Sequence, residues 1–303
     1  MQDFGGIERL LISGATGFIG STLVKAAQAA GVQVTVLSRN PERALKLLGA
    51  VTALSCAAEI ADDAHFDAIV HLAGANVIAW PWTASRRRVL MASRIDIAEE
   101  LLGFLARAKN PPKAWIQASA VGFYATQSTK ALDETSAPGV GFATELCQAI
   151  EAKAASASAF GLRVVNLRIG VVLGKGGGVY PMMRLATLIG GGAVLASGNQ
   201  HFAWVHLDDV VAMLAQASFD ANWVGAINAV APHAPTNQEF AATQAKQLRR
   251  PMLWRIPGFA LRPVLGQRAP LLLEGAEITP TKLLQLGFKF RFANLAAALA
   301  DIG

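Results

Sequence analysis

The sequence predicts an α/β fold in which helices cover both faces of a doubly wound parallel sheet. An apolar run at residues 10–12 leads into a glycine-rich turn at 14–20, and a helix-like stretch at 21–30 follows. Strand and helix patterns then alternate to about residue 170, as expected when parallel strands are joined by crossover helices. The 303 residues exceed one small domain, so we expect a smaller unit beside the sheet.

The glycine turn is a predicted dinucleotide site. Glycines permit a tight turn and a close approach of the backbone to a pyrophosphate, and N–H groups at the start of the next helix can donate hydrogen bonds to it. The alternative is a turn that only packs the strand against the helix. The residues expected to contact the cofactor here are Gly14, Thr16, Gly17, Phe18, Ile19 and Gly20.

The second predicted strand, residues 32–37, ends in Ser38 and Arg39. An acidic residue at this place would bind the adenosine ribose hydroxyls of NAD and repel a 2′-phosphate. A guanidinium can instead bind the phosphate through two charge-assisted hydrogen bonds. The sequence therefore predicts NADP(H) as the cofactor. Arg43 either adds to this contact or belongs to a solvated helix surface after Pro41.

Three further strands are predicted at residues 68–72, 115–119 and 162–169. Ligands bind at the carboxyl ends of parallel strands, so the loop after the first of these is expected to contact the cofactor. His71 ends that buried strand, and we expect it to hydrogen-bond to the backbone. The contacting residues expected in this loop are Leu72, Ala73 and Gly74.

The pattern becomes mixed after residue 173. A glycine loop at 176–178 is followed by a short helix, and Asp208 is the expected N-cap of a later helix. We therefore assign residues 1–173 to the cofactor-binding domain, with a sheet completed by 203–230. Residues 174–303 form mostly a small mixed α/β substrate lobe that is interleaved with this domain.

Composition bears on compartment and membrane association. Hydrophobic residues make up 53% of the chain, yet its longest uncharged stretch, 185–207, is interrupted by glycines and polar residues and does not read as a spanning helix. The N-terminal residues lack the basic and apolar segments of a signal peptide. Cys56 and Cys147 provide neither a disulfide framework nor a metal-ligand spacing. We expect a protein of the cytoplasm, without a metal and without a membrane partner.

The formal net charge of +6 does not predict nucleic-acid binding. The dense basic run at residues 86–88 lies in a predicted helix, 84–108, and reads as a solvated helix face without accompanying aromatic residues. A positive field can also steer an anionic cofactor or substrate toward the protein.

Several motifs together resemble an extended short-chain dehydrogenase/reductase of the nucleotide-sugar epimerase type. The resemblance covers nearly the whole chain, and the tail is similar to the C-terminal domain of unknown function in the atypical "epimerase family" subgroup. It implies a Rossmann-type domain, an unidentified small-molecule substrate and a homodimer as one allowed assembly. The motifs lie at residues 14–20, 71–74, 119–124, 167–174, 204–210 and 271–290.

The chain departs from this family at the residues that transfer protons. The resemblance implies a tyrosine whose pKa, normally ~10, is lowered by a lysine four residues later. Neither Tyr124 nor Tyr180 has a lysine at that spacing. The segment where the pair belongs places Phe142 in the tyrosine slot and Leu146 in the lysine slot, and neither can exchange a proton.

Three residues are candidates to replace this pair: Ser119, Tyr124 and Glu145. Ser119 stands near the family's serine position, although Ala120 also aligns there. Tyr124 follows the Ser119 strand and either reaches the nicotinamide or packs over the cofactor. Glu145 lies in the predicted active-site helix, where a buried carboxylate could act as acid or base and a solvated one would not.

Other reactive or aromatic residues have simpler interpretations. Cys147 and His206 read as buried structural residues. The tryptophans at positions 80, 82 and 204 either stack on a ligand or anchor loops. The sequence thus predicts an NADP(H)-dependent oxidoreductase or a nucleoside-diphosphate-sugar epimerase-like protein without the Tyr-x-x-x-Lys pair. The alternative is a catalytically inactive NADP(H)-binding redox sensor or regulatory protein.

Overall fold

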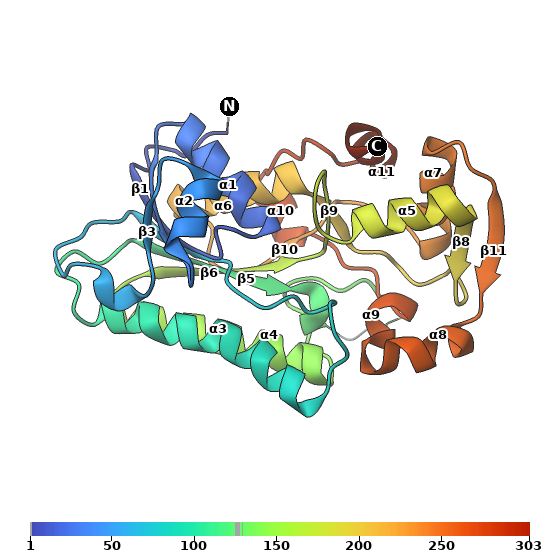
Figure 1. The fold of residues 1–303 in the computed structure, drawn as a ribbon, viewed down its shortest axis with the longest axis horizontal. Coiled ribbons are helices and arrows are strands. Elements are labelled where there is room, and N and C mark those ends of the chain that lie inside the picture. Colours follow the sequence, from blue (N-terminus) through green and yellow to red (C-terminus); the bar gives the residue numbers. More distant parts are fainter. Residues whose placement is uncertain (1, 125–127, 129) are drawn as a thin grey trace.

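A computed structural model describes residues 2–124, 128 and 130–303. Its centre is a parallel sheet with the strand order β10-β6-β5-β4-β1-β2-β3 (Figure 1). This confirms the predicted doubly wound α/β fold. The strands are β1 (Arg9–Ser13), β2 (Gln33–Leu37), β3 (Thr52–Leu54), β4 (Ala68–His71), β5 (Ala114–Ala120), β6 (Arg163–Ile169) and β10 (Gly225–Ala229).

Helices cover both faces of the sheet (Figure 1). One face is covered by α1 (Phe18–Ala29), α2 (Pro41–Leu48) and α6 (Leu207–Phe219), and the other by α3 (Ala84–Leu105) and α4 (Phe142–Ala155). Successive side chains of a strand point to opposite faces. Accordingly Leu10 and Ile12 pack in the core under α1 and α6, whereas Leu11 packs in the core under α3. This burial on both faces explains the almost continuous apolar sequence of β1 and β4.

The order in which the chain adds strands to the sheet reverses between β1 and β4. From β1 the chain proceeds through β2 and β3 to one edge, and from β4 through β5 and β6 toward the other. Ser13 pairs in register with Leu37 on one side and with His71 on the other. The carboxyl ends of β1, β2 and β4 therefore meet, and a ligand binds at such a switch point.

The helix α10 (Thr281–Gln285) packs on the main sheet, where Leu283 joins the core, and most of the other remaining elements form a smaller lobe beside the carboxyl end of the sheet (Figure 1). The lobe contains two short parallel pairs, β7 with β9 and β8 with β11. The division of the chain into 1–173 and 174–303 stays a prediction, although β10 does return to the sheet. The elements are β7 (Val171–Leu173), α5 (Tyr180–Gly190), β8 (Gly192–Leu195), β9 (Trp204–His206), α7 (Asn237–Gln247), β11 (Met252–Ile256), α8 (Gly258–Leu265), α9 (Ala269–Leu273), α10 (Thr281–Gln285) and α11 (Leu295–Ile302).

Short 3₁₀ turns join several of these elements, and one of them follows β5 directly. These turns are η1 (Ala57–Glu59), η2 (Val121–Phe123), η3 (Ser156–Phe160) and η4 (Gly266–Arg268). Among the described residues, none of the helices combines the length and apolar character needed to cross a membrane. Both cysteines are free.

The start of α6 corrects one prediction. Asp208 is not the N-cap: His206 holds that position, and its Nδ1 accepts a hydrogen bond from the Asp208 N–H at 3.2 Å. Asp208 instead pairs with Arg291 at 2.8 Å in the first turn of the helix, where negative charge is favourable. His206 is buried, with Nε2 lying 3.6 Å from Asp301 Oδ2, and its structural role stays a prediction.

Candidate cofactor groove and active site

The glycine turn joins β1 to α1 through close backbone contacts. Gly14 has φ +77°, and a Cβ there would lie 2.5 Å from the carbonyl carbon of Leu72. A Cβ on Gly20 would lie 2.4 Å from the carbonyl oxygen of Gly14. Gly17 is the N-cap of α1 and offers no side-chain cap, so N–H groups in the first turn are open to a ligand.

A second glycine loop packs against the start of α1. A Cβ on Gly177 would lie 2.3 Å from the Phe18 ring, and one on Gly174 would lie 2.9 Å from it. The ring of Phe18 therefore supports the loop after β7 against the glycine turn. This contact gives Gly174, Gly177 and Gly178 a packing role that the sequence alone did not indicate.

Ser38 and Arg39 follow β2 at the same edge of the sheet. Ser38 Oγ donates to the Asn40 carbonyl oxygen at 3.1 Å, and Asn40 caps α2 by accepting from the Arg43 N–H at 2.9 Å. The side chains of Arg39 and Arg43 are exposed. Neither forms an ion pair with any described residue. The predicted contact with the 2′-phosphate therefore depends on the exposed guanidinium of Arg39.

His71 ties the ends of β1 and β4 to α3. Its Nδ1 shares a short hydrogen bond with Ser13 Oγ, and its Nε2 contacts the carbonyl oxygen of Arg94 at 3.1 Å. The predicted backbone hydrogen bond of this histidine is thus confirmed. Burial lowers the pKa of His71 to about 4, so the ring is neutral at physiological pH.

The loop after β4 rests on the side chain of Arg94. A Cβ on Gly74 would lie 2.6 Å from Arg94 Cζ, which explains why glycine occupies this position. Arg94 Nη2 donates to the Ala75 carbonyl oxygen at 3.1 Å, and Nη1 donates to that of Leu90 at 2.9 Å. This guanidinium therefore lies beneath the loop that contains Leu72, Ala73 and Gly74. No motif in the sequence marks Arg94 as a site residue.

Ser119 and Tyr124 belong to one buried polar network. Ser119 Oγ donates to Glu151 Oε1 at 2.6 Å. Arg168 binds both carboxylate oxygens of Glu151, at 2.9 Å through Nε and 2.8 Å through Nη2. Its Nη1 donates to the Tyr124 hydroxyl at 2.9 Å, and that hydroxyl donates to Asn228 Oδ1 at 2.7 Å. Every member of this chain of contacts has a partner.

The network combines charge pairing with ring packing. The Arg168 guanidinium lies 3.4 Å from the centroid of the Phe123 ring, and its side chain is only 6% exposed. Burial raises the pKa of Tyr124, although the hydrogen bond from Arg168 acts in the opposite direction. Sequence reasoning missed Glu151, Arg168 and Asn228. A charged residue within an apolar strand was the available signal for Arg168.

Helix α4 presents different residues to the site than the sequence predicted. Phe142 and Leu146 pack in a cluster with Trp82, Leu90 and Ile150. The face of α4 that carries Cys147 lies against β5 and η2. On this face Cys147 Sγ is 3.6 Å from the Ala120 carbonyl oxygen. Ala143 and Glu151 flank Cys147 on this face. The assignment of Phe142 and Leu146 to the tyrosine and lysine slots is therefore shifted by one residue, and neither register contains the Tyr-Lys pair.

Glu145 is placed apart from Ser119 and Tyr124. It lies in the first turn of α4, and its side chain is exposed and makes no hydrogen bond to the described residues. The buried carboxylate of this helix is that of Glu151. Cys147 is buried, and burial raises the pKa of its thiol, as expected for a structural cysteine.

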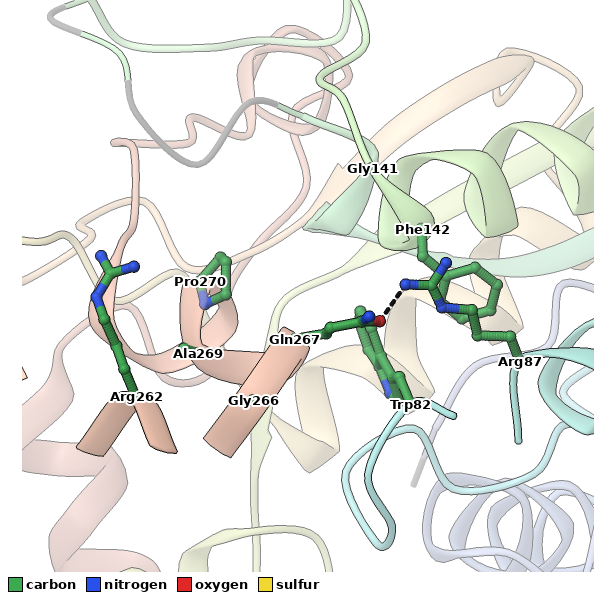
Figure 2. Close-up of a pocket in the computed structure, with 9 residues that line it drawn as sticks. All are labelled: Trp82, Arg87, Gly141, Phe142, Arg262, Gly266, Gln267, Ala269 and Pro270. Carbon is green, nitrogen blue, oxygen red and sulfur yellow. Dashed lines mark hydrogen bonds between the residues drawn. The ribbon is translucent and has the colours of Figure 1, made fainter. Parts of the chain in front are cut away.

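A cavity of about 360 Å³ opens between α4 and the C-terminal helices. Arg87 crosses its mouth, where Nη2 donates to Gln267 Oε1 and the guanidinium lies 5.1 Å from the centroid of the Phe142 ring (Figure 2). Neither Ser119 nor Tyr124 lines the cavity. Its lining residues are Trp82, Arg87, Gly141, Phe142, Arg262, Gly266, Gln267, Ala269 and Pro270.

The three tryptophans have different environments. Trp82 is 7% exposed, donates from Nε1 to the Val77 carbonyl oxygen at 2.9 Å and lines the cavity. Trp204 is fully buried and donates to the His233 carbonyl oxygen at 3.0 Å, which makes it core. Trp80 is 66% exposed. Of the three, Trp82 therefore offers a surface to a ligand in the cavity.

Comparisons with known proteins place the geometry in context. The model of the NAD dependent epimerase/dehydratase family matches residues 10–222, and that of a domain of unknown function, DUF1731, matches residues 256–302. The human epimerase family protein SDR39U1 is 36% identical over 299 residues, which cover 97% of this chain and 99% of that protein. Epimerase family protein YfhF of Bacillus subtilis (strain 168) is 32% identical over 296 residues, covering 97% of each.

Solved structures show the same similarity. The crystal structure of human SDR39U1 (isoform 2) with NADPH superimposes with a TM-score of 0.85 at 32% identity, covering 97% of this chain and 98% of that one. A nucleoside-diphosphate sugar epimerase from Corynebacterium glutamicum gives a TM-score of 0.78 at 27% identity. It covers 100% of this chain, which spans 59% of the length of that protein.

Proposed function

Because the chain belongs to the NAD dependent epimerase/dehydratase family, we propose that it is an NADP(H)-dependent oxidoreductase or a nucleoside-diphosphate-sugar epimerase-like enzyme with non-standard proton-transfer groups. When bound, NADP(H) supplies or accepts a hydride. The observation that carries the proposal is the glycine turn at the switch point of the sheet, together with a cavity of about 360 Å³ at the start of α4.

The residues of the groove fit NADP(H). Gly14 and Gly20 leave no room for a side chain, so the backbone can approach a pyrophosphate. Arg39 is open to the 2′-phosphate, and the human relative was crystallised with NADPH. The other residues proposed to hold the cofactor are Thr16, Gly17, Phe18, Ile19, Ser38, Leu72, Ala73 and Gly74. A reducing compartment such as the cytoplasm suits the two free thiols.

The cavity favours an anionic small-molecule substrate. Arg87 and Arg262 line it; Arg262 also pairs with Glu274 at 3.5 Å, so Arg87 is the lining cation without an ion pair among the described residues. Trp82 and Phe142 add apolar surface that can contact a ring. Because Arg87 and Gln267 come from distant parts of the chain, their contact holds the C-terminal helices against the cofactor-binding domain. Substrate entry is expected to separate these two side chains.

Three residues remain the proposed proton-transfer groups. Tyr124 resembles the missing pair in its chemistry, since the Arg168 cation contacts its hydroxyl. Because burial raises the Tyr124 pKa overall, the hydroxyl suits proton donation to a substrate oxygen more than proton abstraction. Ser119 can orient that oxygen only by releasing Glu151. Glu145 is a solvated carboxylate in the first turn of α4, outside the lining of the cavity, so it could act only on a substrate that reaches beyond the cavity.

The test is NADPH oxidation against a broad panel of carbonyl compounds, with anionic members included. It is repeated with Tyr124→Phe, Ser119→Ala and Glu145→Gln after calorimetry has shown that each variant binds NADPH. A group that transfers the proton should reduce kcat by roughly 10² to 10⁴ when removed. If a substrate is found and all three variants keep the full rate, the assignment of these residues is wrong.

The closed network favours a second candidate function, an inactive NADP(H)-binding sensor. The hydroxyl protons of Ser119 and Tyr124 are already donated to Glu151 and Asn228. A sensor needs cofactor binding and a conformational output, without chemistry. Hydrogen exchange with and without NADPH tests it. The sensor predicts altered protection in residues 256–275 and no turnover of any substrate in the panel.

A further inference from the structure

Arg94 carries a positive charge that no carboxylate of the described residues balances. Its hydrogen bonds go to the carbonyl oxygens of Leu90 and Ala75 and to Ser93 Oγ. Within the described part of the chain it forms no ion pair. Carbonyl oxygens satisfy the hydrogen-bonding capacity of a guanidinium without cancelling its charge, and an unpaired charge away from bulk water is costly.

The groups around Arg94 do not relieve this charge. Burial lowers its pKa, and the neighbouring Arg86 guanidinium acts in the same direction. The thiol of Cys147 faces it from α4, and burial raises the pKa of that thiol, so it is neutral at physiological pH. Glu151, which also acts on Cys147, is paired with Arg168. Among the described residues, Arg86 and Arg94 are therefore neighbouring cations without a counter-ion.

The strand order places Arg94 along the groove. Arg39 follows β2, the glycine turn follows β1, and Gly74 follows β4, and these strands are adjacent in this order. A dinucleotide with its 2′-phosphate at Arg39 and its pyrophosphate at the glycine turn extends its other half over the ends of β4 and β5. Arg94 lies beneath the Gly74 loop at that end. It thus belongs to the nicotinamide half of the groove.

We propose that Arg94 holds an uncompensated positive charge beside the nicotinamide, and that this charge makes the protein bind NADPH more tightly than NADP⁺. The inference rests on the proposed cofactor groove. The oxidised nicotinamide ring is a cation and the reduced ring is neutral, so a nearby guanidinium repels only the oxidised form. The bound cofactor is then mostly NADPH, and the protein is suited to reduce a substrate. An epimerase that begins by oxidising its substrate needs the opposite preference.

Calorimetric titration of the full-length chain tests the preference with three probes: NADPH, NADP⁺ and adenosine 2′,5′-bisphosphate. The wild-type protein should bind NADPH about tenfold more tightly than NADP⁺, the ratio that ~1.4 kcal/mol of repulsion produces. Arg94→Gln should bring this ratio close to one, and Arg94→Lys should keep most of it because the charge remains. Neither variant should change the affinity for the bisphosphate, which lacks the nicotinamide half.

The ratio separates charge from structural support. If Arg94 only holds the Gly74 loop in place, Arg94→Gln weakens NADPH and NADP⁺ equally, the ratio is unchanged, and the inference is overturned. Should that variant fail to fold, Arg86→Gln removes the second cation and should lower the ratio by roughly twofold to threefold. Equal wild-type affinities for both redox forms also overturn the inference but leave the proposed function standing. Absence of binding to any of the three probes overturns the proposed function itself.

Discussion

Arg168 and Arg94 both lie beside the carboxyl end of the sheet, but their guanidinium groups have different kinds of partner. Arg168, on β6, binds Glu151 through two hydrogen bonds and Tyr124 through a third, and it packs on Phe123. Arg94, on α3, contacts backbone carbonyl oxygens and a serine hydroxyl and is left without a counter-ion among the described residues. A closed set of partners fixes a fold, whereas an open charge leaves room for a ligand.

The difference shows why polar residues near a groove cannot all be read as catalytic. Ser119 and Tyr124 attract attention because they are the serine and tyrosine nearest the strand end, yet their hydroxyl groups serve the closed network. Arg39 follows a predicted strand and Arg94 carries no motif, yet among the described residues neither forms an ion pair, so the charges of both remain available. Changes in the closed network and at His71 should therefore alter stability, whereas changes at the open charges should alter ligand binding.

The largest effect is expected where the closed network loses its anion. Glu151→Gln keeps the shape of the side chain but leaves Arg168 buried and unpaired, so the free energy of unfolding should fall by roughly 3 to 5 kcal/mol. Urea unfolding followed by circular dichroism measures it. The control is Glu145→Gln, on the exposed side of the same helix, which should change stability by less than about 0.5 kcal/mol. Equal effects at both positions would contradict the comparison.

A smaller effect is expected at His71, which contacts Ser13 at the end of β1 and the Arg94 carbonyl oxygen on α3. Its pKa is about 4 in the folded chain because burial, and then the charge of Arg94, disfavour the cation. In the unfolded chain a histidine titrates near 6.5, its ordinary value. Between about pH 6.5 and pH 4, the unfolded state therefore binds a proton at His71 that the folded state does not bind. Stability is full above about pH 6.5 and is lost progressively down to about pH 4.

The expected loss from His71 alone is about 2 kcal/mol between pH 7.5 and pH 5. Urea unfolding of the wild type and of His71→Asn at both pH values isolates this contribution, because other titrating groups are common to the two proteins. The wild type should lose more stability than the variant on acidification. Parallel losses would mean that His71 is not held neutral by its surroundings.

The fold and the cofactor groove could be predicted from the sequence because their signals are local. The glycine spacing at 14–20, the apolar strands and the arginine after the second strand each lie within a few consecutive residues. The closed network could not be predicted in the same way. Ser119 and Arg168 are brought together by the register of β5 against β6, and Glu151 joins them only through the packing of α4.

The helix assignment failed for a related physical reason. A shift of one residue turns a helix by about 100°, so a motif aligned one position early presents a different face. Phe142 and Leu146 then pack against Trp82 and Leu90 instead of facing β5. The cavity escaped prediction because Arg87 and Gln267, which meet at its mouth, are 180 residues apart in the chain.

The smallest effect is expected at Arg39, the open charge at the other end of the groove. Because Arg39 is exposed and forms no ion pair with the described residues, Arg39→Ala should leave the free energy of unfolding within about 0.5 kcal/mol of the wild-type value. It should weaken NADPH about tenfold, by ~1.4 kcal/mol, while NADH affinity stays the same, because only NADPH has the 2′-phosphate. Calorimetry with both cofactors measures this, with Arg43→Ala as the matched control on α2. A preference for NADPH that survives Arg39→Ala but disappears in Arg43→Ala would move the phosphate contact one helical turn along the chain.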